Sequence, residues 1–449
     1  MIMDQDSSPA AHRPQPTLSV TDTVALLVGM VIGIGIFKLP SLVAMNSASE
    51  FSFLMLWVAG GVISVIGALC YAELCSAHPD AGGEYHFLTR AFGPSLGFLF
   101  AWARMTVIQT GAIALVAFLT GDYATRIFDL GSHSSAIYAA LTVVLLTALN
   151  IIGTLQSKSA QKMLEIATVG LMIVAIVIGL MHDGGGAAAA QSAPVSIGAT
   201  GLAMVFVLLT YGGWNEVAYL SAEIKDIRRN MVRIVLIGIG LVTVLYLLMS
   251  VAYLNVLGFA GMRASQAVGA DFMQKLLGRP GEVFLSVTII LAALTTVNAA
   301  IITGARTNYA LGRDFPIFRY LGRWDQRAAG PVNALLVQGA ISLALVGLGI
   351  LTGKDFVAMV EYTAPVFWLF LLLTGLSLFV FRHREDSAMR PFKVPFYPVT
   401  PAIFVLVCAY MLYSSLAYTG VGALVGVAVL AAGLPVLWWS RQSDARAAN

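Results

Sequence analysis

The chain has 449 residues, of which 58% are hydrophobic and only 11% are charged, and its mean hydropathy is +0.84. A soluble domain of this composition would expose apolar patches and aggregate, so the composition excludes a soluble protein and indicates a membrane protein. The net charge of +3 includes no basic stripe that would indicate a nucleic-acid partner, and the three cysteines lie in apolar runs and indicate no disulfide framework.

The N-terminal segment is polar and lacks the apolar centre of a signal peptide, so we expect 1–20 to be a disordered cytoplasmic tail. Thr21 or Asp22 is expected to cap the first helix. Apolar runs long enough to cross a bilayer then recur and predict one transmembrane domain, 21–440, followed by a cytoplasmic tail, 441–449. The twelve predicted spans are 22–46, 52–76, 95–120, 136–153, 160–181, 198–222, 231–257, 282–311, 331–352, 357–381, 399–417 and 420–440.

The orientation of the spans follows from the Lys and Arg residues. With both termini on one side, that side collects most of the 26 basic residues, among them Arg228, Arg229 and Arg233. Lys38 and Arg126 are among the few on the other side. The positive-inside rule therefore predicts that both termini are cytoplasmic.

Two of the apolar runs are interrupted by glycines. The first span contains Gly33-Ile-Gly-Ile-Phe37, and the sixth contains Thr210-Tyr-Gly-Gly-Trp-Asn215. Glycines of this kind can simply allow close helix packing. Paired interruptions five spans apart favour a different reading, an inverted repeat of 21–181 and 198–381 with discontinuous helices 1 and 6 and a site at the repeat interface.

An unwound helix centre exposes backbone groups of both signs. Free amides at Ile34, Gly35 and Ile36 would attract a carboxylate, helped by the helix dipole. Free carbonyls near 29–32 and 209–211 would accept hydrogen bonds from an ammonium group. The two breaks together therefore suit a zwitterion such as an α-amino acid.

Several short motifs follow one another along the chain: Gly33-Ile-Gly-Ile-Phe37 with Pro40, Tyr71-Ala-Glu-Leu74, Pro79-Asp-Ala-Gly-Gly-Glu-Tyr85, Ala91-Phe-Gly93, Tyr211-Gly-Gly-Trp-Asn215 and Arg390-Pro-Phe-Lys-Val-Pro395. In this order they resemble the motifs of the amino acid–polyamine–organocation superfamily, and the sixth-span motif is most similar to its L-type amino-acid transporter branch. The resemblance implies an all-α, leucine-transporter-type fold with twelve helices, a 5+5 inverted repeat and two extra helices. It also implies amino-acid transport by alternating access.

The chain departs from the family pattern at the site. Ile34 stands where most members have Ser, so carboxylate binding would rely on amides. Leu209 takes the place of an aromatic gate, leaving Tyr211 or Trp214 to shield the substrate. The resemblance places Gln109 against the substrate side chain; its other reading is a helix–helix hydrogen bond. The expected substrate-binding residues are Ile32, Gly33, Ile34, Gly35, Ile36, Gln109, Leu209, Thr210, Tyr211, Gly212, Trp214 and Asn215.

The resemblance also bears on coupling. Many members carry in helix 5 a lysine that replaces a sodium ion, whereas this chain has Thr168. Thr295 and Thr296 resemble the hydroxyl pair that binds sodium in sodium-coupled relatives. Two readings stay open: a sodium ion near Ile32, Thr295 and Thr296, or no bound metal and substrate exchange.

Four further polar residues lie within the predicted spans, where charges are functional candidates. For Arg104 we expect a structural or gating role, through a pair with Glu73 or Glu216 or by reaching the membrane interface. Glu216 is a candidate for proton coupling or for contact with an amino group. Asn215 is expected to hold unwound backbone or to meet the substrate, and Glu73 to be a structural hydrogen-bond partner.

These observations predict secondary active transport of an amino acid, preferably neutral, by an exchanger or an ion-coupled symporter. A polyamine or cationic amino-acid transporter and a non-transporting nutrient sensor on the same fold are the alternatives. A channel filter, a phosphate-binding loop and a catalytic or metal constellation are absent from the sequence, so we expect no enzyme and no cofactor. The expected partners are the substrate and the lipid bilayer, with no obligatory protein partner and a bacterial inner-membrane location.

Overall fold

The computed structural model describes residues 18–80, 82–152, 158–182, 197–325, 330–353, 355–386, 390–417 and 420–447. Regular structure in these ranges is helical, apart from two isolated β-bridges. The first part of the chain forms α1 (Val20–Val31), η1 (Ile34–Phe37), α2 (Leu39–Met45), α3 (Glu50–Ala77), α4 (Glu84–Phe92), α5 (Pro94–Ala103), η2 (Arg104–Ile108), α6 (Gln109–Ile127), α7 (Ser134–Ile152) and α8 (Lys158–Met181).

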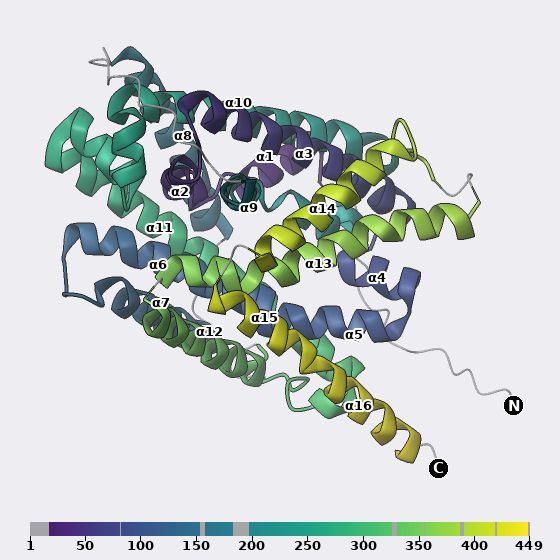
Figure 1. Ribbon diagram of the computed structural model, residues 1–449. Helices are drawn as coiled ribbons and strands as arrows, with labels where there is room; N and C mark the ends of the chain where they lie inside the picture. Colours follow the sequence, from purple (N-terminus) through teal and green to yellow (C-terminus); the bar gives the residue numbers. More distant parts are fainter. Residues whose placement is uncertain are drawn as a thin grey trace, which may run out of the picture.

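The second part continues the bundle shown in Figure 1. It contains α9 (Ile197–Tyr211), η3 (Trp214–Glu223), α10 (Ile227–Ala264), α11 (Val268–Asp314), η4 (Pro316–Phe318), α12 (Val332–Thr352), α13 (Asp355–Arg384), α14 (Val399–Ala417), α15 (Val421–Ala431) and α16 (Gly433–Ala447).

Ten helical stretches of the described chain are long and apolar enough to cross a membrane. The prediction of an all-α protein with many apolar spans is therefore confirmed. The described apolar part of α8, Ile166–Met181, and helix α9 are shorter than a full crossing. Residues 1–17 of the predicted tail 1–20 lie outside the described residues.

Helix α1 begins one turn earlier than expected. Ser19 is its N-cap, and its hydroxyl accepts a hydrogen bond from the Asp22 amide at 3.2 Å. The Asp22 carboxylate in turn accepts the Ser19 amide, also at 3.2 Å. The prediction that Thr21 or Asp22 is the cap was wrong, because a reciprocal capping box places Asp22 three residues inside the helix.

The first predicted break is present. Helix α1 ends at Val31, Gly33 is extended with φ −86° and ψ −168°, and the chain resumes as the short 3₁₀ helix η1. η1 packs against α9 and α11, whereas α1 packs against α10 and η3. The two halves of the first span thus contact different neighbours, as a discontinuous helix requires.

The second break lies at Gly212 and Gly213, between α9 and η3. Gly213 has φ +107°, a left-handed conformation that favours glycine. A Cβ atom added there would lie 2.6 Å from the Met30 carbonyl oxygen and 3.5 Å from Val31 Cα. Gly213 is therefore the point at which the two interrupted spans touch backbone to backbone.

Two glycine kinks extend the bundle beyond the predicted spans. α10 bends at Gly258, with φ +70°, and continues to Ala264; α11 bends at Gly278, with φ +68°, after starting at Val268. The predicted spans 231–257 and 282–311 stop close to these kinks, so they omit the added turns. The connection between the two helices, 265–267, lies close to η1 because Gly269 contacts Phe37.

The bundle has two opposite ends, which Figure 1 shows at α4 and at the α6–α7 connection. We call the end with α4, residues 385–386 and residues 390–398 the α4 face. The end with residues 128–133 and 265–267 is called the Lys38 face. The first break is followed by η1, whose Phe37 contacts Gly269 next to the Lys38 face, and the second by η3, whose Tyr219 contacts Gly83 just before α4.

Replacing Gly213 by alanine should destabilise the protein, because Cβ would collide with the Met30 carbonyl and strain the left-handed backbone. We expect a lower melting temperature in detergent, corresponding to a loss of about 1–3 kcal/mol. The matched control is Gly240→Ala in α10, where an added Cβ meets nothing within 4 Å. Equal melting temperatures for the two variants would contradict the close crossing of the breaks.

Candidate functional site

The carbonyl groups freed by the two breaks share one hydrogen-bond donor. The Tyr246 hydroxyl from α10 lies 2.7 Å from the Val31 carbonyl oxygen and 3.1 Å from that of Thr210. The Val31 oxygen also accepts the Gly33 amide at 2.7 Å. Tyr246 is fully buried, and its hydrogen bonds join the ends of α1 and α9.

Two further tyrosine hydroxyls donate hydrogen bonds to backbone carbonyls of η1, after the first break. Tyr253 of α10 donates to the Ile36 carbonyl at 3.3 Å, and Tyr123 of α6 donates to that of Phe37 at 2.7 Å. An unpaired carbonyl in a membrane interior costs several kcal/mol. These hydroxyls therefore hold η1 in place in the bundle.

The expected carboxylate-binding amides belong to the start of η1. The first amides of a helical turn lack partners within it, and this applies to Ile34 and Gly35. Gly35 approaches α9 closely, since an added Cβ would lie 3.4 Å from both Thr210 Cγ2 and Leu39 Cδ1. Thr210 itself directs its hydroxyl to the Phe206 carbonyl at 2.8 Å.

The aromatic residues of the second break are held by helices outside it. Tyr211 is fully buried, donates to the Trp57 carbonyl at 3.0 Å and packs against the Tyr246 ring. Trp214 packs edge-on against Tyr71 at 5.1 Å. Both rings therefore contact α3.

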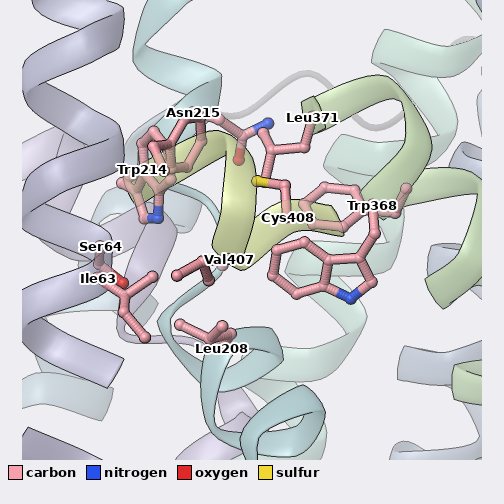
Figure 2. A pocket seen from close by; sticks show the side chains of 12 residues that line it. Ile63, Ser64, Leu208, Trp214, Asn215, Trp368, Leu371, Val407 and Cys408 are labelled. Carbon is pink, nitrogen blue, oxygen red and sulfur yellow. The ribbon is translucent and has the colours of Figure 1, made fainter. Parts of the chain in front are cut away.

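A small cavity adjoins the second break (Figure 2). Its volume of about 20 Å³ is sufficient for roughly one water molecule and not for an amino acid. Trp214 and Trp368 both line it, with Cys408 between them in this view. The remaining lining residues are Ile63, Ser64, Leu208, Gly212, Asn215, Phe367, Leu371, Phe404 and Val407.

A buried carboxylate, that of Glu84 at the start of α4, joins the second break to α3. Its Oε1 accepts from the Tyr71 hydroxyl at 2.5 Å and from the Asn215 amide at 3.1 Å. Its Oε2 accepts from the Tyr219 hydroxyl at 3.2 Å. Burial raises the pKa of Glu84, while the hydrogen bond from Tyr71 acts in the opposite direction.

Arg104 extends this network. Its Nη1 donates to the Tyr219 hydroxyl at 2.6 Å, and its Nη2 lies 3.6 Å from Glu216 Oε2. The guanidinium also lies over the Tyr219 ring, 4.5 Å from the centroid. Of the expected alternatives, the structure shows the pair with Glu216.

Glu73 is engaged elsewhere, as a structural partner at the α4 face. Both of its oxygens accept from Arg382 of α13, at 2.7 and 2.5 Å. It also accepts the Val394 amide at 2.6 Å. The alternative that Arg104 pairs with Glu73 is therefore excluded.

Gln109 follows a π-helical turn, η2, that begins at Arg104. Such turns are common at functional sites. The Gln109 side-chain amide donates to the Ala300 carbonyl at 2.9 Å, so the structure shows the helix–helix hydrogen bond. The Tyr362 hydroxyl donates to the Thr106 carbonyl in the π turn at 2.8 Å.

The hydroxyls considered for sodium lie on α11. Thr295 and Thr296 both donate to the Ala292 carbonyl, at 2.7 and 3.0 Å. A hydroxyl that donates to a carbonyl retains lone pairs for a cation. Thr168 on α8 and Ile32 at the first break are buried.

Comparison with known proteins gives consistent matches. The model of a family described as amino acid permease matches residues 18–439. The human b(0,+)-type amino acid transporter 1 is 29% identical over 91% of this chain and 84% of its own length. The mouse large neutral amino acids transporter small subunit 2 is 28% identical, over 93% and 80%, and the mouse Asc-type amino acid transporter 1 is 27% identical, over 94% and 80%.

The Glu84 network makes a prediction about stability. Glu84→Ala leaves the donors of Tyr71, Asn215 and the half-buried Tyr219 without this acceptor, and it should cost about 1–3 kcal/mol for each donor that stays buried and unpaired. Glu84→Gln retains an acceptor oxygen, so its melting temperature should lie between those of the wild type and Glu84→Ala. Glu50→Ala, at an exposed glutamate, is the control. Indistinguishable melting temperatures for all three variants would refute the network.

Proposed function

Because the chain belongs to the amino acid permease family, a family of transporters rather than enzymes, we propose that it carries amino acids across a membrane by alternating access. The observation that carries the proposal is the crossing of two interrupted spans at Gly213. Their amides and carbonyls offer opposite partial charges at one place, which matches a zwitterion.

The proposed site is built from backbone. The amides of Ile34, Gly35 and Ile36 bind the substrate carboxylate, and the carbonyls near Ile32 and Leu209–Tyr211 bind the ammonium. Support comes from the free helical start at η1 and from the two carbonyls that share the Tyr246 proton. A hydroxyl gives its one proton to one acceptor at a time, and the Val31 oxygen already accepts the Gly33 amide, so the spare acceptor capacity lies on the Thr210 carbonyl.

We propose a neutral substrate. The charged residues beside the second break have partners of their own, since Arg104 pairs with Glu216 and Glu84 accepts three hydrogen bonds. One relative is named for large neutral amino acids. Glu216, whose side chain is 41% exposed, is the residue that would favour the alternative, a cationic amino acid or a polyamine.

The proposed architecture has twelve crossings, with a 5+5 inverted repeat formed by 21–181 and 198–381. Supporting it, breaks occur at matching places in the two halves, and α8 and α9 add two shorter apolar helices to the ten long ones. The proposed orientation has the α4 face and both termini in the cytoplasm, in a bacterial inner membrane, and the distribution of basic residues supports it through the positive-inside rule.

We propose further that the protein works without an obligatory protein partner. One relative is named a small subunit. In this chain the connection between α6 and α7, residues 128–133, contains no cysteine for a disulfide-linked partner. Coupling is proposed as exchange of substrates or symport with an ion, with Thr168 in place of a coupling lysine.

Uptake into proteoliposomes tests the function. Labelled neutral amino acids should accumulate over time, and an exchanger should require unlabelled amino acid inside. Arms without sodium, with a proton gradient, and with cationic amino acids or polyamines separate the coupling and substrate alternatives. Absence of flux in every arm would contradict transport and favour a nutrient sensor.

The backbone site predicts a strong effect at Gly35. Gly35→Val should abolish amino-acid binding, because the valine methyls would collide with Thr210 and Leu39 and displace the η1 amides that are proposed to bind the carboxylate. Gly347→Val in α12 is the matched control, since an added Cβ there meets nothing within 4 Å. Binding is measured by thermal shift with amino acids. Wild-type affinity in Gly35→Val would refute the proposed site.

A further inference from the structure

Lys38 is a buried cation directly after the first break. Its side chain is 9% exposed, and its Nζ lies 2.8 Å from Asp122 Oδ2 on α6. The same Nζ donates to the Gln266 carbonyl in the α10–α11 connection at 2.5 Å. It also lies 5.9 Å from the centre of the Phe356 ring at the start of α13. One ammonium group thus connects the broken first span to the elements around it.

The surrounding contacts fix both partners. The Asp122 carboxylate accepts the Ser135 hydroxyl from α7 at Oδ1, 2.7 Å away. Tyr123, next to Asp122, donates to the carbonyl of Phe37, next to Lys38. The ion pair and this hydrogen bond therefore attach adjacent residues of α6 to adjacent residues at the end of η1.

Other ion pairs on the Lys38 face have different partners. Arg126 of α6 pairs with Asp271 and Glu282, and Arg279 pairs with Glu282. These pairs join α6 to α11 or lie within α11, and Arg126 and Arg279 are 32% and 55% exposed. Unlike these pairs, the pair of Lys38 with Asp122 involves the first broken span, at the residue directly after η1.

We propose that Lys38 and Asp122 form a latch that closes the Lys38 face over the substrate site and must open in each transport cycle. The proposal rests on alternating access as the function. The two side chains position η1, whose amides are proposed to bind the carboxylate, and do not themselves contact substrate.

The energetics of a buried ion pair suit such a latch. Desolvation of two charges offsets much of their attraction, so a closed pair contributes little net stability. Removing one partner is different, because it leaves the other charge buried and uncompensated. When the face opens, both charges regain water. The pair therefore favours a single closed geometry. Because its net contribution is small, the closed and open states differ little in free energy.

The test measures opening of the Lys38 face directly. A cysteine at Ala267, which is 1% exposed and follows Gln266, reports opening by its rate of labelling with a membrane-impermeant maleimide. The parent chain, whose three cysteines are buried, gives the background. Lys38→Met and Asp122→Asn should each increase the labelling rate at least about fivefold, since either leaves one charge that hydrates better in the open state.

The double variant identifies the pair as a unit. If the two residues act through one ion pair, Lys38→Met with Asp122→Asn should label no faster than either single variant. Lys38→Arg, which keeps the charge, should label at close to the parent rate. Lys275→Met, at an exposed lysine of the same face, is the matched control and should leave labelling unchanged.

Each outcome decides the proposal. Unchanged labelling in both single variants, or additive increases in the double variant, would overturn the latch. Asp122→Asn keeps the size of the side chain, so it remains informative if Lys38→Met fails to fold. Labelling requires no substrate, so it tests the latch separately from transport. Increased labelling without uptake would support the latch and refute transport. Uptake with unchanged labelling would support transport and refute the latch.

Discussion

The hydroxyl of Tyr246 lies between the carbonyls at the ends of two interrupted helices, those of Val31 and Thr210. A membrane interior offers no water to such carbonyls, so an interrupted helix survives only where the protein or a ligand supplies donors. Tyr246 supplies one proton for two carbonyls. The Val31 carbonyl also accepts the Gly33 amide, so the Thr210 carbonyl is the one that keeps acceptor capacity for a second donor, the property that a site for an ammonium group needs.

The polar networks on either side of the breaks act on different halves of the interrupted spans. Towards the α4 face, Glu84 connects Asn215 of η3 to Tyr71 of α3. Towards the Lys38 face, tyrosines and the proposed latch hold η1. The second half of each broken span thus has its own attachment, η3 towards the α4 face and η1 towards the Lys38 face, and this separation suits the alternating access that we propose.

The sequence was sufficient for features that depend on local pattern. Hydropathy located the long helices, and clustered glycines located both breaks, because only glycine tolerates the backbone of Gly213. The Glu84 network was not predictable, since Tyr71, Glu84 and Asn215 stand in separate motifs and no local pattern shows that the fold brings these motifs into contact. Tyr246, within an apolar run, gave no local signal either. The helical turns after Gly258 and before Gly278 were missed, because a hydropathy window detects the apolar spans and not the less apolar turns that extend them.

The central claim is that backbone groups at the breaks recognise both charges of a zwitterion, and calorimetric titration of the purified protein tests it most directly. The titration compares three ligands with the same side chain. A neutral α-amino acid carries both charges, whereas its α-carboxamide and the corresponding decarboxylated amine carry only the ammonium. The account predicts heat of binding for the amino acid and at least about a hundredfold weaker binding for the other two, which is roughly 2.7 kcal/mol. Equal affinity of the amine and the amino acid would contradict it, because the amides of η1 would then have no role in recognition.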